Sequence, residues 1–90
     1  MRHINTSRTA LAVGTVVGLF HFFWAALVAA GWAKPLMDFI LRLHFIQLDV
    51  QIAPFALGTA AALVALTFAV GALFGLVFAL VWNRLAGPAA

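Results

Sequence analysis

The chain contains no cysteine, and only 8% of its 90 residues are charged, of which two are acidic. Without cysteine there is no disulfide, no thiolate metal site and no thiol nucleophile. The five basic residues are too few and too scattered to form a nucleic-acid-binding surface. Because 67% of the residues are hydrophobic, a soluble domain of this size could not bury its apolar surface. The composition therefore predicts one membrane domain that binds no nucleic acid.

The long apolar segments also lack the side chains that catalysis requires. No Lys, Arg, Asp or Glu occurs between residues 9 and 33, and residues 55–82 contain no carboxylate. The chain has no phosphate-binding loop, no metal-ligand spacing and no serine or cysteine nucleophile paired with a base. We therefore expect no enzymatic activity.

Two segments, residues 10–33 and 55–82, predict transmembrane helices. At a rise of 1.5 Å per residue they would reach roughly 36 and 42 Å, enough for a hydrocarbon core of roughly 30 Å. Thr9 or Ser7 is expected to cap the first helix, Lys34 and Pro35 to end it, and Pro54 to open the second near its first turn. Residues 1–9 form an N-terminal segment and residues 83–90 a C-terminal tail. The first segment exceeds the apolar core of about 7–15 residues found in signal peptides, so we expect it to be retained.

The connecting segment, residues 34–54, is not an ordinary loop. Residues 35–45 are rich in Leu, Ile and Phe, and Asp38 and Arg42 lie four apart on one face, which predicts an interfacial helix lying flat on the membrane. Residues 46–52 alternate strictly between apolar and polar side chains. This pattern predicts a short strand that would need a partner strand, for example from a second copy of the chain. The alternative is an irregular surface loop whose apolar residues enter the headgroup region.

Tryptophan and charge predict how the two spans are oriented. Trp32 and Trp82 lie at the far ends of the spans, where the amphipathic indole prefers the headgroup level. The terminal segments carry Arg2, Arg8 and Arg84, whereas in the connecting segment Lys34 and Arg42 are offset by Asp38 and Asp49. The positive-inside rule therefore predicts both termini in the cytoplasm.

Each span contains one GxxxG motif, Gly14 to Gly18 and Gly71 to Gly75, and the second stripe continues through Ala79. Small residues at this spacing let helix backbones approach closely in lipid. With the span centres at the membrane midplane, an antiparallel pair places Gly14 level with Gly75 and Gly18 level with Gly71. The predicted fold is an all-α, two-transmembrane-helix antiparallel hairpin with an amphipathic interfacial connection.

His21 lies near the centre of the first apolar segment, where an ionisable side chain is by default a functional-site hypothesis. In the predicted hairpin it comes level with Thr67, whose hydroxyl could satisfy a neutral imidazole. Two alternatives remain open. One is axial ligation of a haem or chlorophyll-type macrocycle beside the aromatic run of residues 20–24, and the other is proton conduction with Trp24 in an oligomeric channel. Apart from these alternatives we expect no cofactor and no metal.

Three stretches, HFFWAA at 21–26, LMDFILRLHF at 36–45 and GALFGLVFALVWNRL at 71–85, resemble small bacterial two-helix membrane proteins of unknown function, some of them labelled holin-like. The resemblance implies a hairpin in the bacterial inner membrane. We expect the chain to act through helix packing, as a homo-oligomer or as an accessory subunit of a larger membrane complex. The alternative function is a holin-like or channel-forming oligomer.

Overall fold

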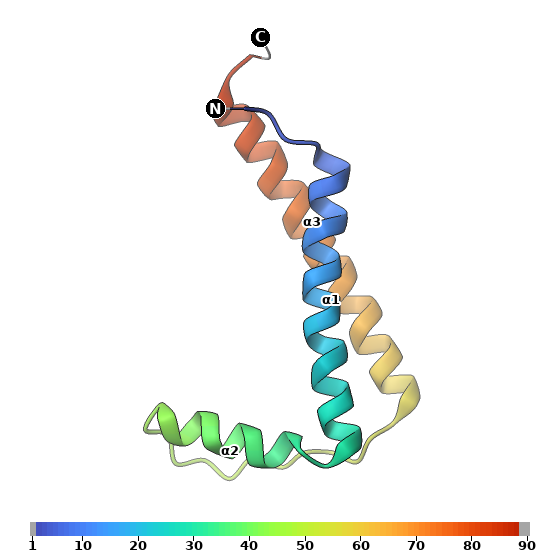
Figure 1. Ribbon diagram of the computed structural model, residues 1–90, viewed down its shortest axis with the longest axis vertical. Coiled ribbons are helices and arrows are strands. Elements are labelled where there is room, and N and C mark those ends of the chain that lie inside the picture. Colours follow the sequence, from blue (N-terminus) through green and yellow to red (C-terminus); the bar gives the residue numbers. More distant parts are fainter. Residues whose placement is uncertain (1, 89–90) are drawn as a thin grey trace.

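The computed structural model describes residues 2–88 as three helices, with no strand among them. These helices are α1 (Thr6–Ala30), α2 (Ala33–Leu43) and α3 (Leu57–Ala86). Helices α1 and α3 run in opposite directions and cross, while α2 projects sideways from the end of α1 (Figure 1). The all-helical prediction is confirmed.

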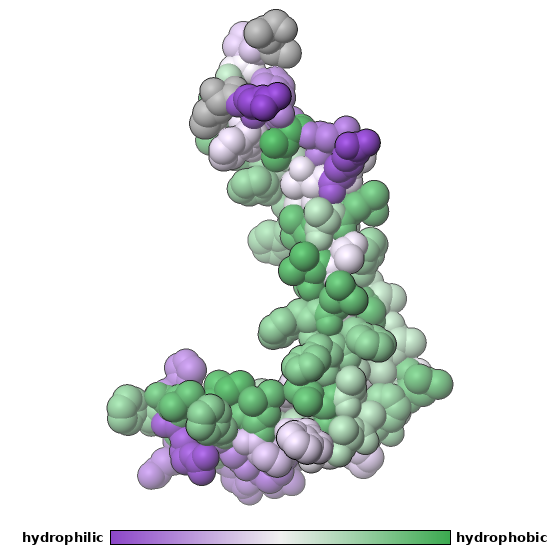
Figure 2. Space-filling model, in the orientation of Figure 1, coloured by the Kyte–Doolittle hydropathy of each residue, from purple (hydrophilic) through white to green (hydrophobic). Residues whose placement is uncertain are grey.

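Both α1, with 25 residues, and α3, with 30, are long and apolar enough to cross a membrane. Only 17% of the most apolar stretch of each helix is buried within the molecule. The molecule measures 54 by 33 by 14 Å, so its thickness is that of a single layer of helices. Most of the apolar surface therefore faces outward, as the green surface in Figure 2 shows for one side of the molecule.

The observed ends of α1 differ from the predicted span of 10–33. The helix is capped by Asn5, whose side-chain oxygen accepts a hydrogen bond from the backbone N–H of Arg8 at 2.8 Å, and not by Ser7 or Thr9. It ends at Gly31, which adopts the left-handed conformation with φ of 79°, and not at Lys34 and Pro35. The predicted start was too late because the polar first turn is already helical. The predicted end was too late because Gly31 ends the helix before Lys34 is reached.

Pro35 lies inside the first turn of α2, where a backbone N–H has no partner within the helix and proline is tolerated. The chain then reverses at Phe45, which has φ of 60°, and the backbone N–H of Ile46 donates to the Leu41 carbonyl at 2.9 Å. The strand predicted for residues 46–52 is wrong. The segment is irregular, as the alternative of a surface loop predicted, and returns beside α2 (Figure 1). Within residues 2–88 no second strand lies against it to supply ladder hydrogen bonds.

Helix α3 begins at Leu57, two residues after the predicted start, and continues four residues beyond the predicted end at 82. Pro54 precedes the helix and does not lie in its first turn. Nothing in residues 83–86 interrupts helical geometry, and the helix ends at Gly87, which has φ of 81°. Residues 83–86, predicted as tail, are therefore the last turn of α3.

Candidate functional site

Small residues form the centre of the contact between α1 and α3. We call Gly14, Gly18, Gly71, Gly75 and Ala79 the glycine seam, and all five are buried. A Cβ placed on Gly75 would lie 2.8 Å from the Thr9 carbonyl oxygen and 2.9 Å from the Cα of Ala10. A Cβ placed on Gly14 would lie 2.8 Å from the Phe68 carbonyl oxygen. The two backbones therefore touch, which only residues without a side chain allow.

The register of the seam differs from the predicted one by about one helical turn. A Cβ on Gly71 would lie 3.1 Å from the Cα of Gly14, and a Cβ on Gly18 would lie 3.4 Å from the Cβ of Phe68. Gly14 is thus opposite Gly71, and not opposite Gly75 as the alignment of span centres placed it. Aligning the centres of the observed helices would give the same wrong register. The alignment failed because backbone contact, not helix length, determines which residues lie opposite one another.

His21 and Thr67 do not meet. The Nδ1–H of His21 donates to the Val17 carbonyl at 2.8 Å, and the hydroxyl of Thr67 donates to the Leu63 carbonyl at 2.7 Å, so each side chain bonds its own helix. Beyond the seam the two helices diverge (Figure 1), and a cavity of about 750 Å³ separates them between Phe22 and Phe68. The predicted contact is wrong for two reasons. It placed Gly18 opposite Gly71, and it assumed that the two helix axes do not cross.

His21 instead lines a cavity of about 430 Å³ between α1 and α2, which we call the α1–α2 corner. Its walls are apolar and aromatic: Phe20, Phe23, Trp24 and Leu27 from α1, and Leu36, Met37 and Ile40 from α2. The Phe20 ring meets the imidazole edge-on, with ring centroids 5.5 Å apart. Three of the four aromatic residues predicted around His21 therefore lie in this corner, whereas Phe22 lines the α1–α3 cavity.

The two ends of the chain are held together by a group of hydrogen bonds that we call the terminal clamp. The Asn83 side chain accepts from the backbone N–H of Ile4 at 2.8 Å and donates to the Ile4 carbonyl at 2.9 Å. The indole N–H of Trp82 donates to the Arg2 carbonyl at 2.6 Å, and the His3 ring donates to the Gly87 carbonyl. Trp82 also stacks on Phe78, with centroids 6.0 Å apart. The sequence predicted Trp82 at the end of the second span. It gave no signal for the hydrogen bonds of Asn83, because they join residues 79 positions apart.

A second set of polar contacts joins the returning segment to α2. The Lys34 ammonium lies 3.4 Å from the carboxylates of Asp38 and Asp49 and donates to the Val50 carbonyl at 3.0 Å. Desolvation lowers the pKa of Lys34, but hydrogen bonds and attraction from the two carboxylates outweigh it and raise the pKa above 10.5. Asp38 thus pairs with Lys34, one turn before it, while Arg42 lies over the Phe39 ring at 5.9 Å. Lys34 and Asp38 are four residues apart, as are Asp38 and Arg42, so this pair is local to the helix. The contact of Lys34 with Asp49 depends on the chain reversal at Phe45.

Charge separates the two ends of the helix pair. Arg2, Arg8 and Arg84 are exposed at the end where the termini meet, and both acidic residues lie at the other end with Lys34 and Arg42. Trp32, at the junction of α1 and α2, is 69% exposed. The arrangement offers a packing surface, an apolar corner with one imidazole and two differently charged ends.

No known family model, curated protein or solved structure matches the chain.

Removing the Asn83 amide is expected to open the terminal clamp. Asn83→Leu deletes two hydrogen bonds, each contributing about 0.5–1.5 kcal/mol, so exchange of the Ile4 amide proton should accelerate roughly 5- to 150-fold. Asn83→Asp keeps the acceptor but loses the donor and should give a smaller acceleration. Hydrogen exchange followed by NMR in detergent micelles measures both effects, with the exposed Leu85→Ala as control. Unchanged exchange at Ile4 in Asn83→Leu would contradict this assignment.

Proposed function

We propose that the chain is a small integral membrane protein that inserts as a two-span hairpin and acts through helix packing. One observation carries the proposal: the buried residues of α1 and α3 are all Gly or Ala, while most of their Leu, Val and Phe side chains are exposed. In water such a surface would aggregate, because large exposed apolar patches drive association. In lipid it is matched to the acyl chains, and close backbone contact supplies the helix pairing.

The α2 helix fits the membrane interface. Lys34, Asp38 and Arg42 follow one another at intervals of four residues on one face, and Leu36, Met37 and Ile40 lie on the side toward α1. Figure 2 shows green along the side of this helix that faces the helix pair and purple beneath it. With α1 along the membrane normal, the apolar face of α2 would enter the bilayer and its charges would remain in water.

The charge distribution supports termini in the cytoplasm. Three arginines flank the end where the termini meet, whereas the charges of the α2 end cancel. Cytoplasmic ends of membrane proteins carry the excess of Lys and Arg. The resemblance to small bacterial two-helix proteins supports the bacterial inner membrane as the location.

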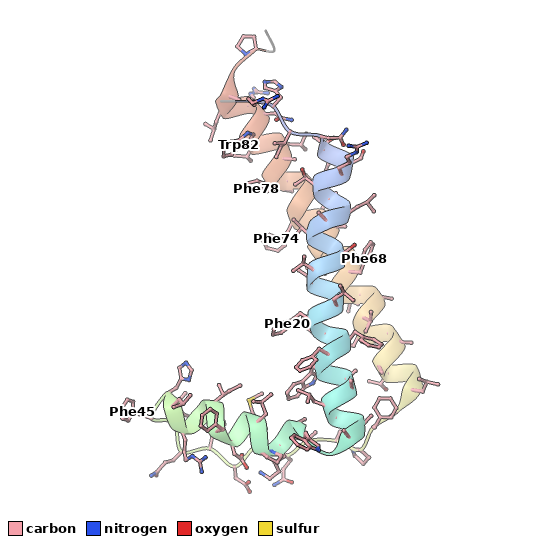
Figure 3. The ribbon with its side chains drawn as sticks, in the orientation of Figure 1. Phe20, Phe45, Phe68, Phe74, Phe78 and Trp82 are labelled. Atoms are coloured by element: carbon pink, nitrogen blue, oxygen red, sulfur yellow. The ribbon has the colours of Figure 1, made fainter. Side chains whose placement is uncertain are left out.

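Partners are expected on the outer faces of the hairpin, because the seam is already occupied within the chain. Phe20, Phe74 and Phe78 project from α1 and α3 on the side toward which α2 extends (Figure 3). Aromatic side chains of this kind are suited to packing against another apolar helix. The proposed function is therefore association with further membrane helices, as a homo-oligomer or as an accessory subunit of a membrane complex.

Fractionation and reconstitution test the proposal. The tagged chain should stay with membranes during alkaline carbonate washing, and in mild detergent it should purify either as an oligomer of defined mass or with an integral membrane partner. Liposomes containing it should retain a trapped dye. Release by carbonate would contradict the membrane assignment, and dye leakage from liposomes containing the chain alone would replace it with the channel-forming alternative.

A further inference from the structure

His21 has no part in the packing of α1 against α3, and the hydrogen bonding of its ring leaves one nitrogen available to a ligand. Because a carbonyl oxygen only accepts, the hydrogen bond to Val17 requires the proton to be on Nδ1. In the neutral imidazole the lone pair is then on Nε2. The bond to Val17 is the only one that the His21 side chain makes within residues 2–88, and Nε2 is not enclosed by protein. The ring is therefore held in one orientation with a free ligand atom.

The position of His21 makes this free nitrogen unusual. It lies nine residues before the end of α1, roughly 14 Å along the helix from α2. If α2 lies at the interface, as proposed above, that depth is close to the middle of a hydrocarbon core of roughly 30 Å. No water is available there to donate a hydrogen bond to Nε2, and a lone polar group in such surroundings is costly. A metal ion held in a largely apolar carrier molecule would bind the lone pair of Nε2.

The α1–α2 corner has the size and lining for such a carrier. Its volume of about 430 Å³ lies within the range of about 300–1,000 Å³ of small-molecule sites. Phe20, Phe23 and Trp24 supply flat apolar surfaces beside the imidazole, and Leu36 and Ile40 of α2 form the side nearest the interface. The α1–α3 cavity of about 750 Å³ has no such ligand, since only Phe, Ala, Leu and Val line it.

We propose that the α1–α2 corner binds a planar metallotetrapyrrole through axial coordination of its metal by His21 Nε2. The inference rests on the proposed hairpin insertion. An Nδ1–H donated to a backbone carbonyl is the outer contact that fixes the tautomer and orientation of metal-binding histidines. The edge of the macrocycle nearest α2 would reach the interface, where polar substituents meet water. Iron porphyrins and magnesium chlorins share this coordination chemistry.

Titration of the purified full chain in detergent micelles tests the proposal with two probes, iron protoporphyrin IX and chlorophyll a. One of them should bind at one site per chain with a shifted absorption spectrum, and which one does so identifies the metal and ring. His21→Ala should weaken that binding by more than about tenfold, since even outer contacts of metal ligands contribute that much. His44→Ala is the matched control, because its Nδ1 bonds the Ile40 carbonyl in the same way but the residue is exposed at the far end of α2.

A second pair of variants leaves His21 intact. Ile40→Trp fills the corner from α2 and should also weaken binding, whereas Leu43→Trp on the same helix lies outside the lining and should not. Binding of neither probe, or equal binding by the His21→Ala and unsubstituted chains, would overturn the proposal. Carbonate-resistant membrane insertion should be the same in all variants, so failure of this site is distinguishable from failure of the hairpin.

Discussion

Substituting Gly75 with leucine is expected to abolish the packing of α1 against α3, while the same substitution at Gly58 leaves it intact. Both residues belong to α3, but a Cβ on Gly75 would meet the backbone of Thr9 and Ala10 within 2.9 Å, whereas Gly58 has nothing within 4 Å. Backbone cannot move aside as a flexible side chain can. Even Gly75→Ala should cost about 1–3 kcal/mol, the range for overpacked interiors, and leucine more.

The other seam glycines should follow an order set by what each one touches. Gly14→Ala meets the Phe68 carbonyl at 2.8 Å and should resemble Gly75→Ala, whereas Gly18→Ala makes an ordinary 3.4 Å contact and should cost little. Gly58→Ala should change stability by no more than about 1 kcal/mol through helix propensity. Energy transfer between dyes on the two helices, measured during denaturation in micelles, gives the free energy of separating the helices for each variant. Equal effects of alanine at positions 58 and 75 would contradict backbone contact at the seam.

Leu66→Arg should strongly oppose membrane insertion. Leu66 is 66% exposed and lies nine residues after the start of α3, close to the depth of His21, so in the proposed hairpin it faces lipid where a cation is least tolerated. The expected cost is about 2.5–3.5 kcal/mol, which lowers the equilibrium constant for insertion by roughly two orders of magnitude. Leu85→Arg, at a site 73% exposed in the last turn of α3, should have almost no effect because arginine there reaches the headgroups.

The comparison of these two variants separates a membrane protein from a soluble one. On a water-exposed surface, replacing either leucine with arginine changes stability by no more than about 0.5 kcal/mol. The fraction of chain that resists carbonate extraction measures the difference. Equal extraction of Leu66→Arg, Leu85→Arg and the unsubstituted chain would contradict lipid exposure of α3.

Composition was sufficient to predict two long apolar helices, although not where they begin and end. Long apolar runs without charges predict long helices, and Gly14, Gly18, Gly71 and Gly75 stand at the spacing that brings backbones together. The register could not be predicted in the same way. It depends on backbone contacts such as that of Gly75 with Ala10, and on the terminal clamp, whose Asn83 amide has no periodic signal.

The connecting segment and His21 show a second limit. Alternation in residues 46–52 describes which side chains are polar, but a strand also needs a partner, and the Lys34 side chain holds this segment instead. Likewise the position of His21 was evident, but its neighbours depend on the crossing of α1 and α3 and on the direction of α2. The local sequence pattern predicts neither the crossing angle of α1 and α3 nor the angle between α1 and α2.

Disulfide crosslinking in native membranes tests the account most directly, because the chain has no cysteine of its own. A Cβ on Gly18 lies 3.4 Å from that of Phe68, close to the 3.5–4.5 Å that joins two cysteines, so Gly18→Cys with Phe68→Cys should crosslink within one chain in high yield. Gly18→Cys with Ala72→Cys, one turn further along α3, should crosslink poorly. Preferential crosslinking of the second pair, or crosslinks formed only between chains, would contradict the observed closure of α1 on α3.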